Sequence, residues 1–452
     1  MVTAPHPTGF AYRAADRHPW VEAVLRERLG PAADRLERAI SADDEMLEHS
    51  WRGNGGDLDA ALAGYFASGA RVAASLDQLV EQRFGGWQRV ESVLDFGCGY
   101  GRVTRFLALR LPLERIWASD ILPGAVEFQR RQLLVHGFPS AIEPADLDCE
   151  RRFDLIYVGS LFTHLPASRF IAWFERLAGL LEPGGLLAFT VHDEVLLPPH
   201  KEMPREGLVF EPSSESRTLD GADYGSTWVT PSYVASMIER FGRYQARREP
   251  RGLCDYQDLW LVTHRESSLL RDLAYDGGVA GHIERADLSL GALDLRGWAI
   301  HRGAFGVESI SVLLGGEEVG RCTRFERRED LARALGDQRF ADAAWHCECR
   351  LPAPLRRSAE VVLVVARSTG GASNLLFAGS LEQLLHLVHR EAYLRHRQRV
   401  YELAEVVEAM KQSRFWRLRR AWFRIKRLLG WTAEDPDGPV IEKADRRPPA
   451  ER

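Results

Sequence analysis

The chain has 452 residues, a formal net charge of −5, 45% hydrophobic side chains and six cysteines. This length exceeds one ordinary domain, and the negative charge excludes a global basic field for nucleic acid. The cysteines form no C-x-x-C pair, the start lacks the apolar core of a signal peptide, and no apolar run reaches the roughly 20 residues of a membrane span. The sequence predicts two or three globular domains in the cytoplasm and no nucleic-acid partner.

Residues 1–88 are predicted to form a helical N-terminal extension. Apolar side chains recur at helical spacing in WVEAVLRERL, in AADRLERAI and in the long stretch from Asp59 to Phe84. We expect these helices to cover part of the domain that follows.

The stretch VLDFGCGYGRVTRFL, residues 93–107, joins a predicted strand to a predicted helix through a glycine-rich turn. Glycine stands at every second position, at Gly97, Gly99 and Gly101. Glycine permits positive φ and lets a ligand approach the backbone, and the helix that follows points its free N–H groups at that ligand. The spacing departs from the G-x-G-x-x-G of dinucleotide binders, because Arg102 fills the third glycine position. We predict a nucleotide-like binding loop.

Four more strand patterns follow and alternate with helical patterns. RIWASD ends in Asp120, 19 positions after Gly101 (120 − 101), a spacing at which acids bind ribose hydroxyls in doubly wound folds. AIEPADLD is predicted as the third strand with Asp146 at its end, FDLIYVGSLFTHL runs out into Gly159 and Ser160, and LLEPGGLLAFTVHD supplies a fifth strand. This alternation predicts a mainly parallel sheet with a ligand beyond the carboxyl ends of its strands.

In this order, DFGCGYGR, ASD, FDLIYVGSLFTHL and EPGGLLAFT resemble class I S-adenosylmethionine-dependent methyltransferases. The resemblance implies an α/β domain over residues 89–266, with a seven-stranded Rossmann-like sheet, helices on both faces and a last antiparallel strand, QDLWLVTHR. It also implies S-adenosylmethionine (SAM) as the cofactor. YFASG, residues 65–69, resembles an N-terminal extension that caps the cofactor site in a subset of these enzymes; a plain helical cover over the sheet is the alternative.

The resemblance assigns a role to each part of the predicted cofactor site. The acid and glycines of the loop surround the methionine part, the acid after the second strand holds the ribose, and the residue after it packs on the adenine. The third segment holds the adenine edge, and the end of the fourth strand lines the methyl-transfer side. The implied cofactor-binding residues are Asp95, Gly97, Gly99, Gly101, Asp120, Ile121, Asp146, Leu147, Gly159 and Ser160.

Methyl transfer to a hydroxyl group requires alignment of the acceptor and a base that removes its proton. Histidine suits this role because its unperturbed pKa is near neutrality. His192, paired with Asp193, is the preferred catalytic candidate, and His164 in FTHL is the second. Metal-assisted transfer stays open because Asp193 and Glu194 are close to the site, but no ligand set can be assembled, so no metal is predicted.

The fifth strand is followed by a long segment rich in Pro, Gly, Ser and charge, residues 196–228. Loops of this length are usually lids or binding loops. We expect it to recognise the acceptor, with Tyr224 as a contact. The fourth strand ends in VGSLFTHL rather than the Asn/Asp-Pro-Pro-Tyr of enzymes that methylate amino groups of adenine or glutamine, and no Pro-Cys pair offers a nucleophile for pyrimidine carbon.

Residues 270–380 carry strand patterns separated by turns, including LLGGEEVG, which is typical of a hairpin with a Gly-Gly turn. They predict a small β-sandwich. This segment resembles the GWA sandwich modules appended to bacterial glycosyltransferases and other envelope-polysaccharide enzymes.

The tail, residues 381–431, is predicted to be a long amphipathic helix, basic in its second half, and residues 432–452 are predicted to be disordered. Basic residues around an apolar stripe with tryptophans suit an anionic membrane surface, which would place the protein peripherally at the inner face of the membrane. Packing on the protein itself or on a partner is the alternative, and RNA binding is a third reading.

Taken together, these features predict a SAM-dependent methyltransferase. The expected acceptor is a sugar hydroxyl on an envelope glycan or lipid-linked saccharide. One alternative is a methyltransferase of small metabolites whose C-terminal region makes it an oligomer. The other is a SAM-binding scaffold for glycan assembly.

Overall fold

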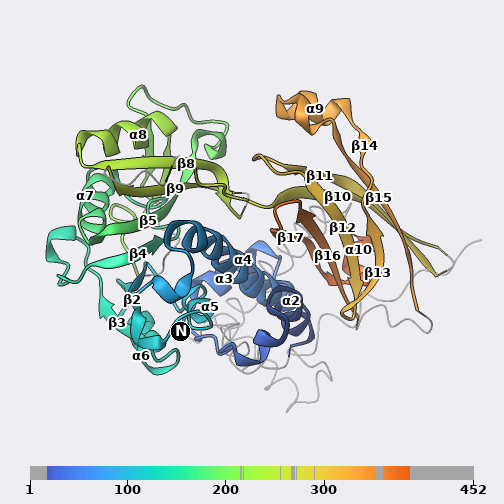
Figure 1. Cartoon of the computed structure of the whole chain (residues 1–452), viewed down its shortest axis with the longest axis horizontal. Helices are drawn as coiled ribbons and strands as arrows, with labels where there is room; N and C mark the ends of the chain where they lie inside the picture. Colours follow the sequence, from blue (N-terminus) through green and yellow to red (C-terminus); the bar gives the residue numbers. More distant parts are fainter. Residues whose placement is uncertain are drawn as a thin grey trace, which may run out of the picture. The chain divides into compact units, whose positions relative to one another are not determined.

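In the computed structural model, all described residues fall within the unit Pro5–Glu391 (Figure 1). The predicted helix beyond residue 386 and the predicted disordered end lie outside the described residues. The described residues are 18–213, 216, 218–254, 256–265, 270, 272–289, 291–352 and 360–386.

Three α-helices form the described part of the N-terminal extension: α2 (Pro19–Leu29), α3 (Glu45–Gly53) and α4 (Leu58–Phe84). The carboxylate of Asp44 accepts hydrogen bonds from backbone N–H groups of the first turn of α3, and the carboxylate of Asp57 does the same for α4. Two predicted helices are confirmed as α2 and α4. The expected helix in AADRLERAI is wrong, because that segment holds only a short 3₁₀ helix, Gly30–Arg35.

Seven strands of the central sheet follow the order β3-β2-β1-β4-β5-β9-β8. The first five are parallel, and β9 is antiparallel to both β5 and β8. The predicted antiparallel last strand, QDLWLVTHR, is thus confirmed, whereas the predicted number of seven strands is too small, because two further short strands beside the end of β5 bring the described sheet to nine. The strands are β1 (Val93–Phe96), β2 (Ile116–Asp120), β3 (His136–Pro139), β4 (Phe153–Val158), β5 (Leu181–Asp193), β8 (Tyr244–Leu253) and β9 (Gln257–His264).

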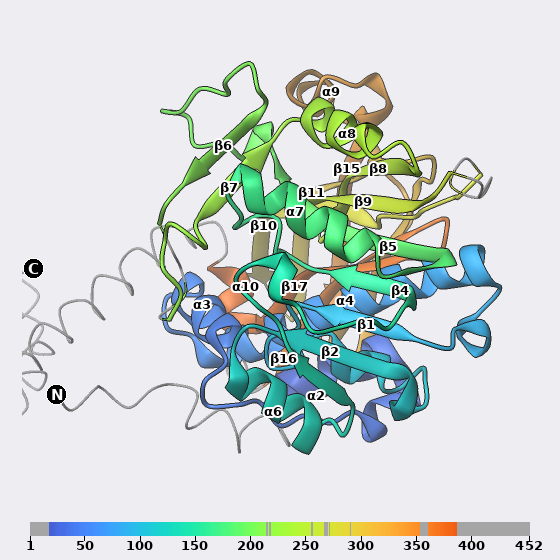
Figure 2. The same ribbon diagram turned by 90° about the vertical axis from the view of Figure 1, so that its left-hand side faces the viewer.

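Helices cover both faces of this sheet because its strands are apolar on both sides. Leu94 and Ile156 belong to a core cluster with α7 and α8, whereas their neighbours Val93 and Leu155 belong to a cluster with α4. In Figure 2, α7 lies in front of the sheet and α4 behind it. The helices of this region are α5 (Thr104–Leu107), α6 (Pro123–Arg131), α7 (Ala167–Ala178) and α8 (Pro231–Arg240).

The third strand lies earlier in the chain than the sequence predicts. It is β3, His136–Pro139, and the segment AIEPADLD instead contains a short 3₁₀ helix, Pro144–Asp146. Pro144 stands at the start of this helix, where a missing N–H group costs nothing, whereas inside a strand it would remove a ladder hydrogen bond. The prediction that Asp146 ends a strand is therefore wrong.

The segment after β5 contains two short antiparallel strands, β6 (Leu208–Glu211) and β7 (Ser226–Val229). β7 pairs in parallel with the end of β5 through His192 and Asp193. The long loop that the sequence predicts is therefore attached to the sheet at its carboxyl edge.

Two four-stranded antiparallel sheets, β10-β11-β15-β14 and β13-β12-β16-β17, occupy the span for which the sequence predicts a small β-sandwich. They share one hydrophobic cluster, to which Leu295 and Trp345 contribute from the first sheet and Val312 and Val364 from the second. The resemblance to envelope-polysaccharide modules stays a prediction. The elements are β10 (Val279–Ser289), β11 (Ala292–His301), β12 (Val307–Leu314), β13 (Glu317–Cys322), β14 (Glu326–Arg327), α9 (Glu329–Leu335), β15 (Asp342–Arg350), β16 (Val361–Ser368), β17 (Ser373–Ser380) and α10 (Leu381–Leu385).

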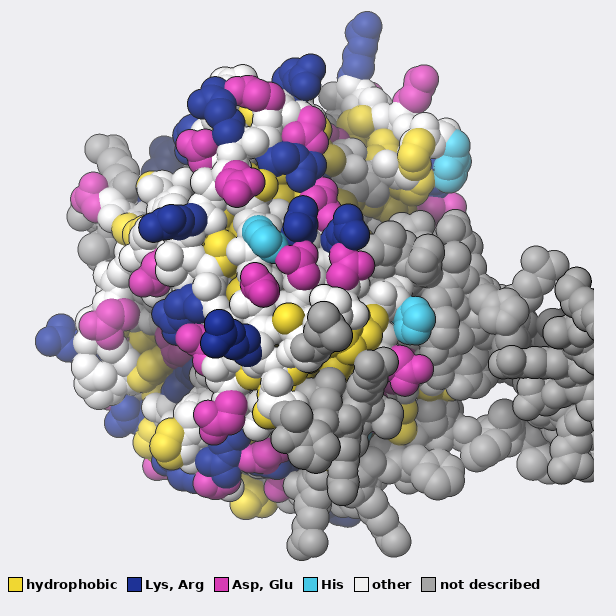
Figure 3. Space-filling view, turned by 90° about the vertical axis from the view of Figure 1, so that its right-hand side faces the viewer, with side chains coloured by type: hydrophobic (Ala, Val, Ile, Leu, Met, Phe, Trp, Pro, Cys, Tyr) yellow, Lys and Arg dark blue, Asp and Glu magenta, His cyan; other side chains and the backbone are white. Residues whose placement is uncertain are grey.

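The hairpin predicted in LLGGEEVG is confirmed. Strands β12 and β13 pair antiparallel around Gly315 and Gly316, whose φ angles of +58° and +93° are those that glycine adopts without strain. Acidic and basic side chains are interspersed on the described face shown in Figure 3. Among the helices of the described residues, none combines the length and apolar character that a membrane span requires.

The antiparallel sheet β13-β12-β16-β17 contacts the N-terminal helices. Trp20 and Val24 of α2 and Ala63 of α4 share a buried cluster with Leu363 and Val365 of β16. Helix α4 therefore packs against the central sheet on one side and against β16–β17 on the other.

Candidate functional site

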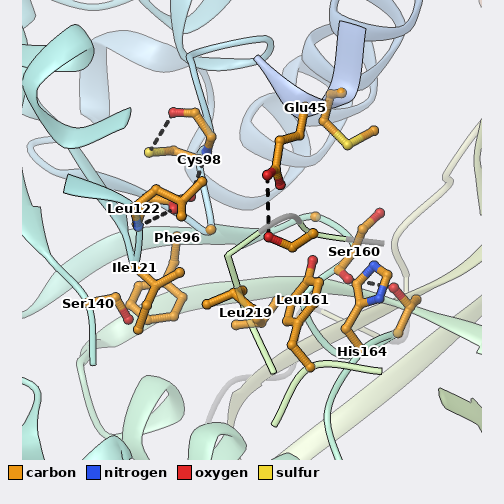
Figure 4. Close-up of a pocket in the computed structure, with 18 of the residues that line it drawn as sticks. Glu45, Phe96, Cys98, Ile121, Leu122, Ser140, Ser160, Leu161, His164 and Leu219 are labelled. Atoms are coloured by element: carbon orange, nitrogen blue, oxygen red, sulfur yellow. Dashed lines mark hydrogen bonds between the residues drawn. The ribbon is translucent and has the colours of Figure 1, made fainter. Parts of the chain in front are cut away.

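A cavity of about 670 Å³ lies at the carboxyl ends of β1, β2, β4 and β5. Its walls come from the glycine loop, from α3 and α4, and from the segment between β6 and β7. Figure 4 shows Ile121, Leu122 and Ser140 on one side of the cavity and Ser160 and His164 on the opposite side. The cavity thus has a half next to β2 and β3 and a half next to β4 and β5.

The first two glycines of the loop have uncrowded Cβ positions, since a Cβ atom on Gly97 would only touch Leu161 at 3.8 Å. Gly97 and Gly99 have φ angles of +71° and +51°, and no atom lies within 4 Å of the place that a Cβ atom on Gly99 would occupy. Gly101 has a different reason to be glycine, because a Cβ atom there would collide with the side chain of Leu133. Gly97 and Gly99 line the cavity, and Gly101 packs behind them.

Two buried acids stand beside the loop, as predicted. The Asp120 carboxylate accepts hydrogen bonds from the N–H groups of Gly99 (2.8 Å) and Leu122 (2.9 Å), and burial raises its pKa. Asp95 accepts a hydrogen bond of 2.6 Å from the Thr104 hydroxyl, and burial, reinforced by the charge of Asp120, raises its pKa to about 6. These desolvated carboxylates suit the hydroxyl and ammonium groups of a nucleoside amino acid.

The half of the cavity next to β3 is not built as the sequence predicts. Ile121 and Leu122 line it, but they are joined by residues 140–142, directly after β3, in place of Asp146 and Leu147. Asp146 is exposed in its 3₁₀ helix and Leu147 is buried in the hydrophobic core, and neither lines the cavity. The sequence predicted the third strand too late in the chain, and this explains the difference. The residues that reach the cavity are those that follow the observed strand β3.

The N-terminal extension forms part of the cavity wall. Glu45, Met46 and His49 of α3, and Ser68 and Val72 of α4, line it. The resemblance of YFASG to a capping extension thus agrees with the position of these two helices.

The close contact between α4 and the glycine loop depends on Gly69. A Cβ atom at this position would overlap the carbonyl oxygen of Arg102 and the ring of Phe106. Next to it, the Arg102 guanidinium donates to the Ser68 hydroxyl at 3.1 Å. The extension is therefore packed directly on the loop that holds the ligand.

Arg105, which the sequence analysis did not single out, fixes the same contact from the other side. Its guanidinium is 1% exposed and donates to the carbonyl groups of Gly101 and Tyr100 in the loop and of Glu37 and Ala39 in the extension. A buried arginine that bonds only carbonyl groups joins two backbone segments that are distant in sequence.

His164 lies in the half of the cavity next to β4. Its Nδ1 atom is 2.7 Å from the carbonyl oxygen of Gly225, and its ring stacks on Tyr224 with centroids 4.3 Å apart. A carbonyl oxygen only accepts, so Nδ1 carries a proton, and in the neutral form of the ring the lone pair is at Nε2. Both His164 and Tyr224 line the cavity, as predicted.

His192 also lines the cavity, but its environment differs. Its Nε2 atom lies 3.3 Å from the amide nitrogen of Gln257, and its Nδ1 atom is buried with no hydrogen-bond partner among the described residues. Burial, and then the nearby His164, lower the pKa of His192 to about 4. The ring is therefore neutral at pH 7 and is a weak base.

Asp193 does not lie with His192. Successive side chains of a strand point to opposite faces, and Asp193 turns towards Arg248 and Arg251, with oxygen–nitrogen distances of 3.8 and 3.9 Å. It does not line the cavity, and no hydrogen bond described for this chain joins it to His192. The expected His192–Asp193 pair is absent from the described geometry.

Ser160 and Gly159 line the cavity at the end of β4, as predicted. The side chain of Ser160 is held by Gln257 and not by either histidine. The Gln257 amide donates to the Ser160 hydroxyl at 2.9 Å, and Gln257 and Tyr256 both line the cavity. The sequence analysis missed these two residues. Their signal was the antiparallel last strand, whose first residues must lie at the carboxyl edge of the other strands.

Within the described ranges, no group of three or more His, Cys, Asp and Glu side chains is arranged to hold a metal ion. The residues fit the predicted cofactor better. The open backbone at Gly97 and Gly99 and the carboxylate at the end of β2 are arranged to bind a nucleoside, and the acids suit a cationic sulfonium.

The strand order, the glycine loop and the acid at the end of β2 define a Rossmann-like nucleotide-binding domain. Residues 94–187 match the family model described as a methyltransferase domain.

Known proteins resemble parts of the chain. Trans-aconitate 2-methyltransferase of Methylobacterium nodulans is 30% identical over 172 residues, which are 36% of this chain and 65% of the relative. Ribosomal protein L11 methyltransferase of Pseudomonas aeruginosa is 36% identical over 138 residues, 29% of this chain and 43% of the relative. A solved DhpI–SAH complex is 17% identical, with a TM-score of 0.32, and the match covers 50% of this chain and 98% of that chain.

This chain thus spans less than two thirds of the length of each of the two relatives. The family match and the named relatives support a methyltransferase domain in this chain, with SAM as the cofactor of that domain.

Proposed function

We propose that this chain is a SAM-dependent O-methyltransferase whose acceptor is a sugar hydroxyl on an envelope glycan or lipid-linked saccharide. The observation that carries the proposal is the position of His164. Its tautomer is fixed by the Gly225 carbonyl, and it lies in the same cavity as the glycine loop and Asp120.

SAM, when bound, supplies an electrophilic methyl group on a sulfonium. In the transfer, the hydroxyl oxygen bonds to the methyl carbon while the carbon–sulfur bond breaks, and the sulfur keeps the electron pair. The protein must align the hydroxyl and accept its proton. His164 accepts this proton at Nε2, because Nδ1 is already protonated and bonded to Gly225. His192, with its pKa near 4, is the poorer base.

The charges of the cavity favour a hydroxyl over a carboxylate as the acceptor. Among its described lining residues, the Arg and Lys side chains are Arg102 and Arg169. Arg102 donates to Ser68, and Arg169 forms ion pairs with Glu143 (2.7 Å) and Asp223. A carboxylate acceptor would have to compete with Glu143 and Asp223 for Arg169. This supports a different acceptor from the acid in the name of the trans-aconitate methyltransferase.

The glycan part of the proposal rests on the C-terminal half of the chain. The two antiparallel sheets occupy the segment that resembles modules of envelope-polysaccharide enzymes, and the basic tail predicted from the sequence suits an anionic membrane. Both features would help the protein to bind a large acceptor at a membrane surface, whereas methylation of a free metabolite needs neither of them.

The test is transfer of labelled methyl from SAM into a fractionated envelope extract, with the wild type beside Asp120→Ala. We expect label in the polysaccharide or lipid-linked fraction, and its loss in the variant. Label only in small molecules would favour methylation of a metabolite. No label in any fraction, with SAM binding intact by calorimetry, would contradict the enzymatic proposal and favour a SAM-binding scaffold.

A further inference from the structure

We propose that Tyr256, Gln257 and Ser160 form the subsite that binds the sugar ring of the acceptor. The apolar face of the ring packs on Tyr256, and two of its hydroxyl groups donate to Gln257 and Ser160. This inference rests on the proposed function, and it assigns the part of the cavity that selects the acceptor.

The polar part of the subsite consists of Ser160, Gln257 and His192, which lie at the ends of β4, β9 and β5. We call this hydrogen-bonded group the arc. The Gln257 amide nitrogen is 2.9 Å from the Ser160 hydroxyl and 3.3 Å from His192 Nε2, and the Ser160 hydroxyl is 3.1 Å from the Gln257 amide oxygen. With His192 protonated at Nδ1, both N–H groups of Gln257 are engaged within the protein. Its oxygen and the Ser160 oxygen retain lone pairs, so the arc accepts hydrogen bonds.

An accepting arc selects for groups that carry protons. Neighbouring sugar hydroxyls each donate one hydrogen bond, whereas a carboxylate brings only oxygen lone pairs and is repelled. Ser160 and Gln257 both line the cavity, so a ligand bound there reaches them. The arc therefore favours a hydroxylated acceptor, and this argument does not depend on the ion pairs of Arg169.

The apolar part of the subsite is the ring of Tyr256. This ring is 52% exposed although it lines a cavity, and it meets the His192 ring edge-on, with centroids 5.3 Å apart and planes at 74°. Five large apolar side chains are exposed in the described part of the chain, and Met46, Ile142 and Tyr256 among them line this cavity. Tyr256 is the one beside the polar arc, and an aromatic face with polar groups at its edge matches the two-sided surface of a pyranose.

Backbone strain gives a second, independent indication of a binding site. Four non-glycine residues in the described ranges have positive φ, and two of them, Ser160 (+63°) and Cys254 (+56°), line the cavity. Ser160 is held in this conformation on both sides, because its N–H group donates to the Thr190 hydroxyl at 2.8 Å and its carbonyl accepts from Thr163. Strain that neighbouring groups maintain is typical of ligand clamps.

The experiment measures acceptor kinetics with the polysaccharide fraction of the envelope extract, its concentration expressed as hexose. Tyr256→Ala should raise the apparent KM for this fraction about five- to tenfold, as loss of one aromatic contact implies. Gln257→Leu should lower kcat/KM roughly tenfold or more, because it removes an acceptor of hydrogen bonds. Neither variant should change the affinity for S-adenosylhomocysteine by more than about twofold.

Two variants serve as controls. Tyr256→Phe keeps the ring and should keep the wild-type KM. Leu134→Ala removes an apolar side chain that is more exposed than Tyr256, at 65% against 52%, and that does not line the cavity, so it should change neither parameter.

An unchanged KM in Tyr256→Ala together with an unchanged kcat/KM in Gln257→Leu would overturn the subsite while leaving the enzyme established. Loss of S-adenosylhomocysteine affinity in place of acceptor affinity would also overturn it. Alkali-labile label, released as volatile methanol, would identify a carboxylate acceptor and contradict the subsite. Failure of the wild type to transfer any methyl group would overturn the proposed function, and the subsite with it.

Discussion

His164 is arranged to receive a proton by contacts from the segment before β7. The Gly225 carbonyl fixes which nitrogen carries hydrogen, and the Tyr224 ring fixes the plane of the imidazole. His192 is neutral at pH 7, since burial lowers its pKa to about 4. Two histidines of one cavity thus have different chemistry because their environments differ.

We expect His164→Ala to lower kcat by about 10²–10⁴-fold, the usual contribution of a general base, and to leave S-adenosylhomocysteine affinity unchanged. His192→Ala should lower kcat less. The control is His136→Ala, which removes an exposed histidine stacked on Trp117 outside the cavity. A larger loss in His192→Ala than in His164→Ala would return the base to His192.

The buried carboxylate of Asp95 destabilises the folded state at neutral pH. Burial raises its pKa from 3.8 to about 6, so its stabilising contribution is present at low pH and is lost as pH rises through 6. Asp95→Asn should therefore raise the free energy of unfolding at pH 7.5, by up to about 3 kcal/mol, and this gain should vanish below about pH 4. Urea unfolding at several pH values measures it.

The same variant should bind S-adenosylhomocysteine more weakly, because the carboxylate is part of the ligand site. A gain in stability without loss of affinity would show that Asp95 does not contact the ligand.

At the scale of elements, α4 is the helix of the N-terminal extension that packs on the glycine loop and forms part of the cavity wall. Its register is set by Gly69, which lets the helix approach Arg102 and Phe106, and by the hydrogen bond between Arg102 and Ser68. The contact is part of the cavity, since Ser68 lies one residue before Gly69 and lines it.

Gly69→Ala should destabilise the protein by about 1–3 kcal/mol, because the added methyl group overlaps backbone and a buried ring, and it should weaken S-adenosylhomocysteine binding. Gly64→Ala is the matched control in the same helix. The nearest atom to its new Cβ is the Ser50 hydroxyl at 3.8 Å, so this change should stabilise the helix by up to about 1 kcal/mol. Thermal melting and calorimetry compare the two; equal effects would contradict the role of Gly69.

At the scale of the described unit, the N-terminal helices join the nucleotide-binding sheet to β16 and β17. Gln78 of α4 exchanges two hydrogen bonds with the backbone of Asp276, of 3.0 and 2.9 Å, and Arg28 of α2 donates to the Ser373 hydroxyl at 2.7 Å. The apolar cluster around Trp20 adds to these contacts. The antiparallel sheets are thus packed on the elements that line the cofactor cavity.

We expect S-adenosylhomocysteine to slow amide hydrogen exchange in β16 and β17 as well as in the glycine loop, because α4 contacts both. Leu363→Asp, which places a charge in the shared cluster, should uncouple the two responses. Slower exchange confined to the glycine loop in the wild type would show that the sheets do not sense the ligand.

The sequence by itself determined the nucleotide loop, Asp120, the antiparallel last strand and the Gly315–Gly316 hairpin. These features depend on local patterns, such as glycine where φ is positive and apolar runs that end in an acid, and short-range geometry is legible in a short stretch. The third strand was missed because HGFP is a weak strand pattern, whereas AIEPADLD appeared stronger despite its proline.

The tertiary structure alone decided which side chains share the cavity. Gln257 reaches Ser160 across 97 residues because β9 runs antiparallel and starts at the carboxyl edge of the sheet. Asp193, next to His192 in sequence, points to the opposite face of β5 and meets Arg248. Adjacency in sequence places side chains on opposite faces of a strand, whereas pairing between distant strands brings side chains together, and that pairing is set by packing of the whole sheet.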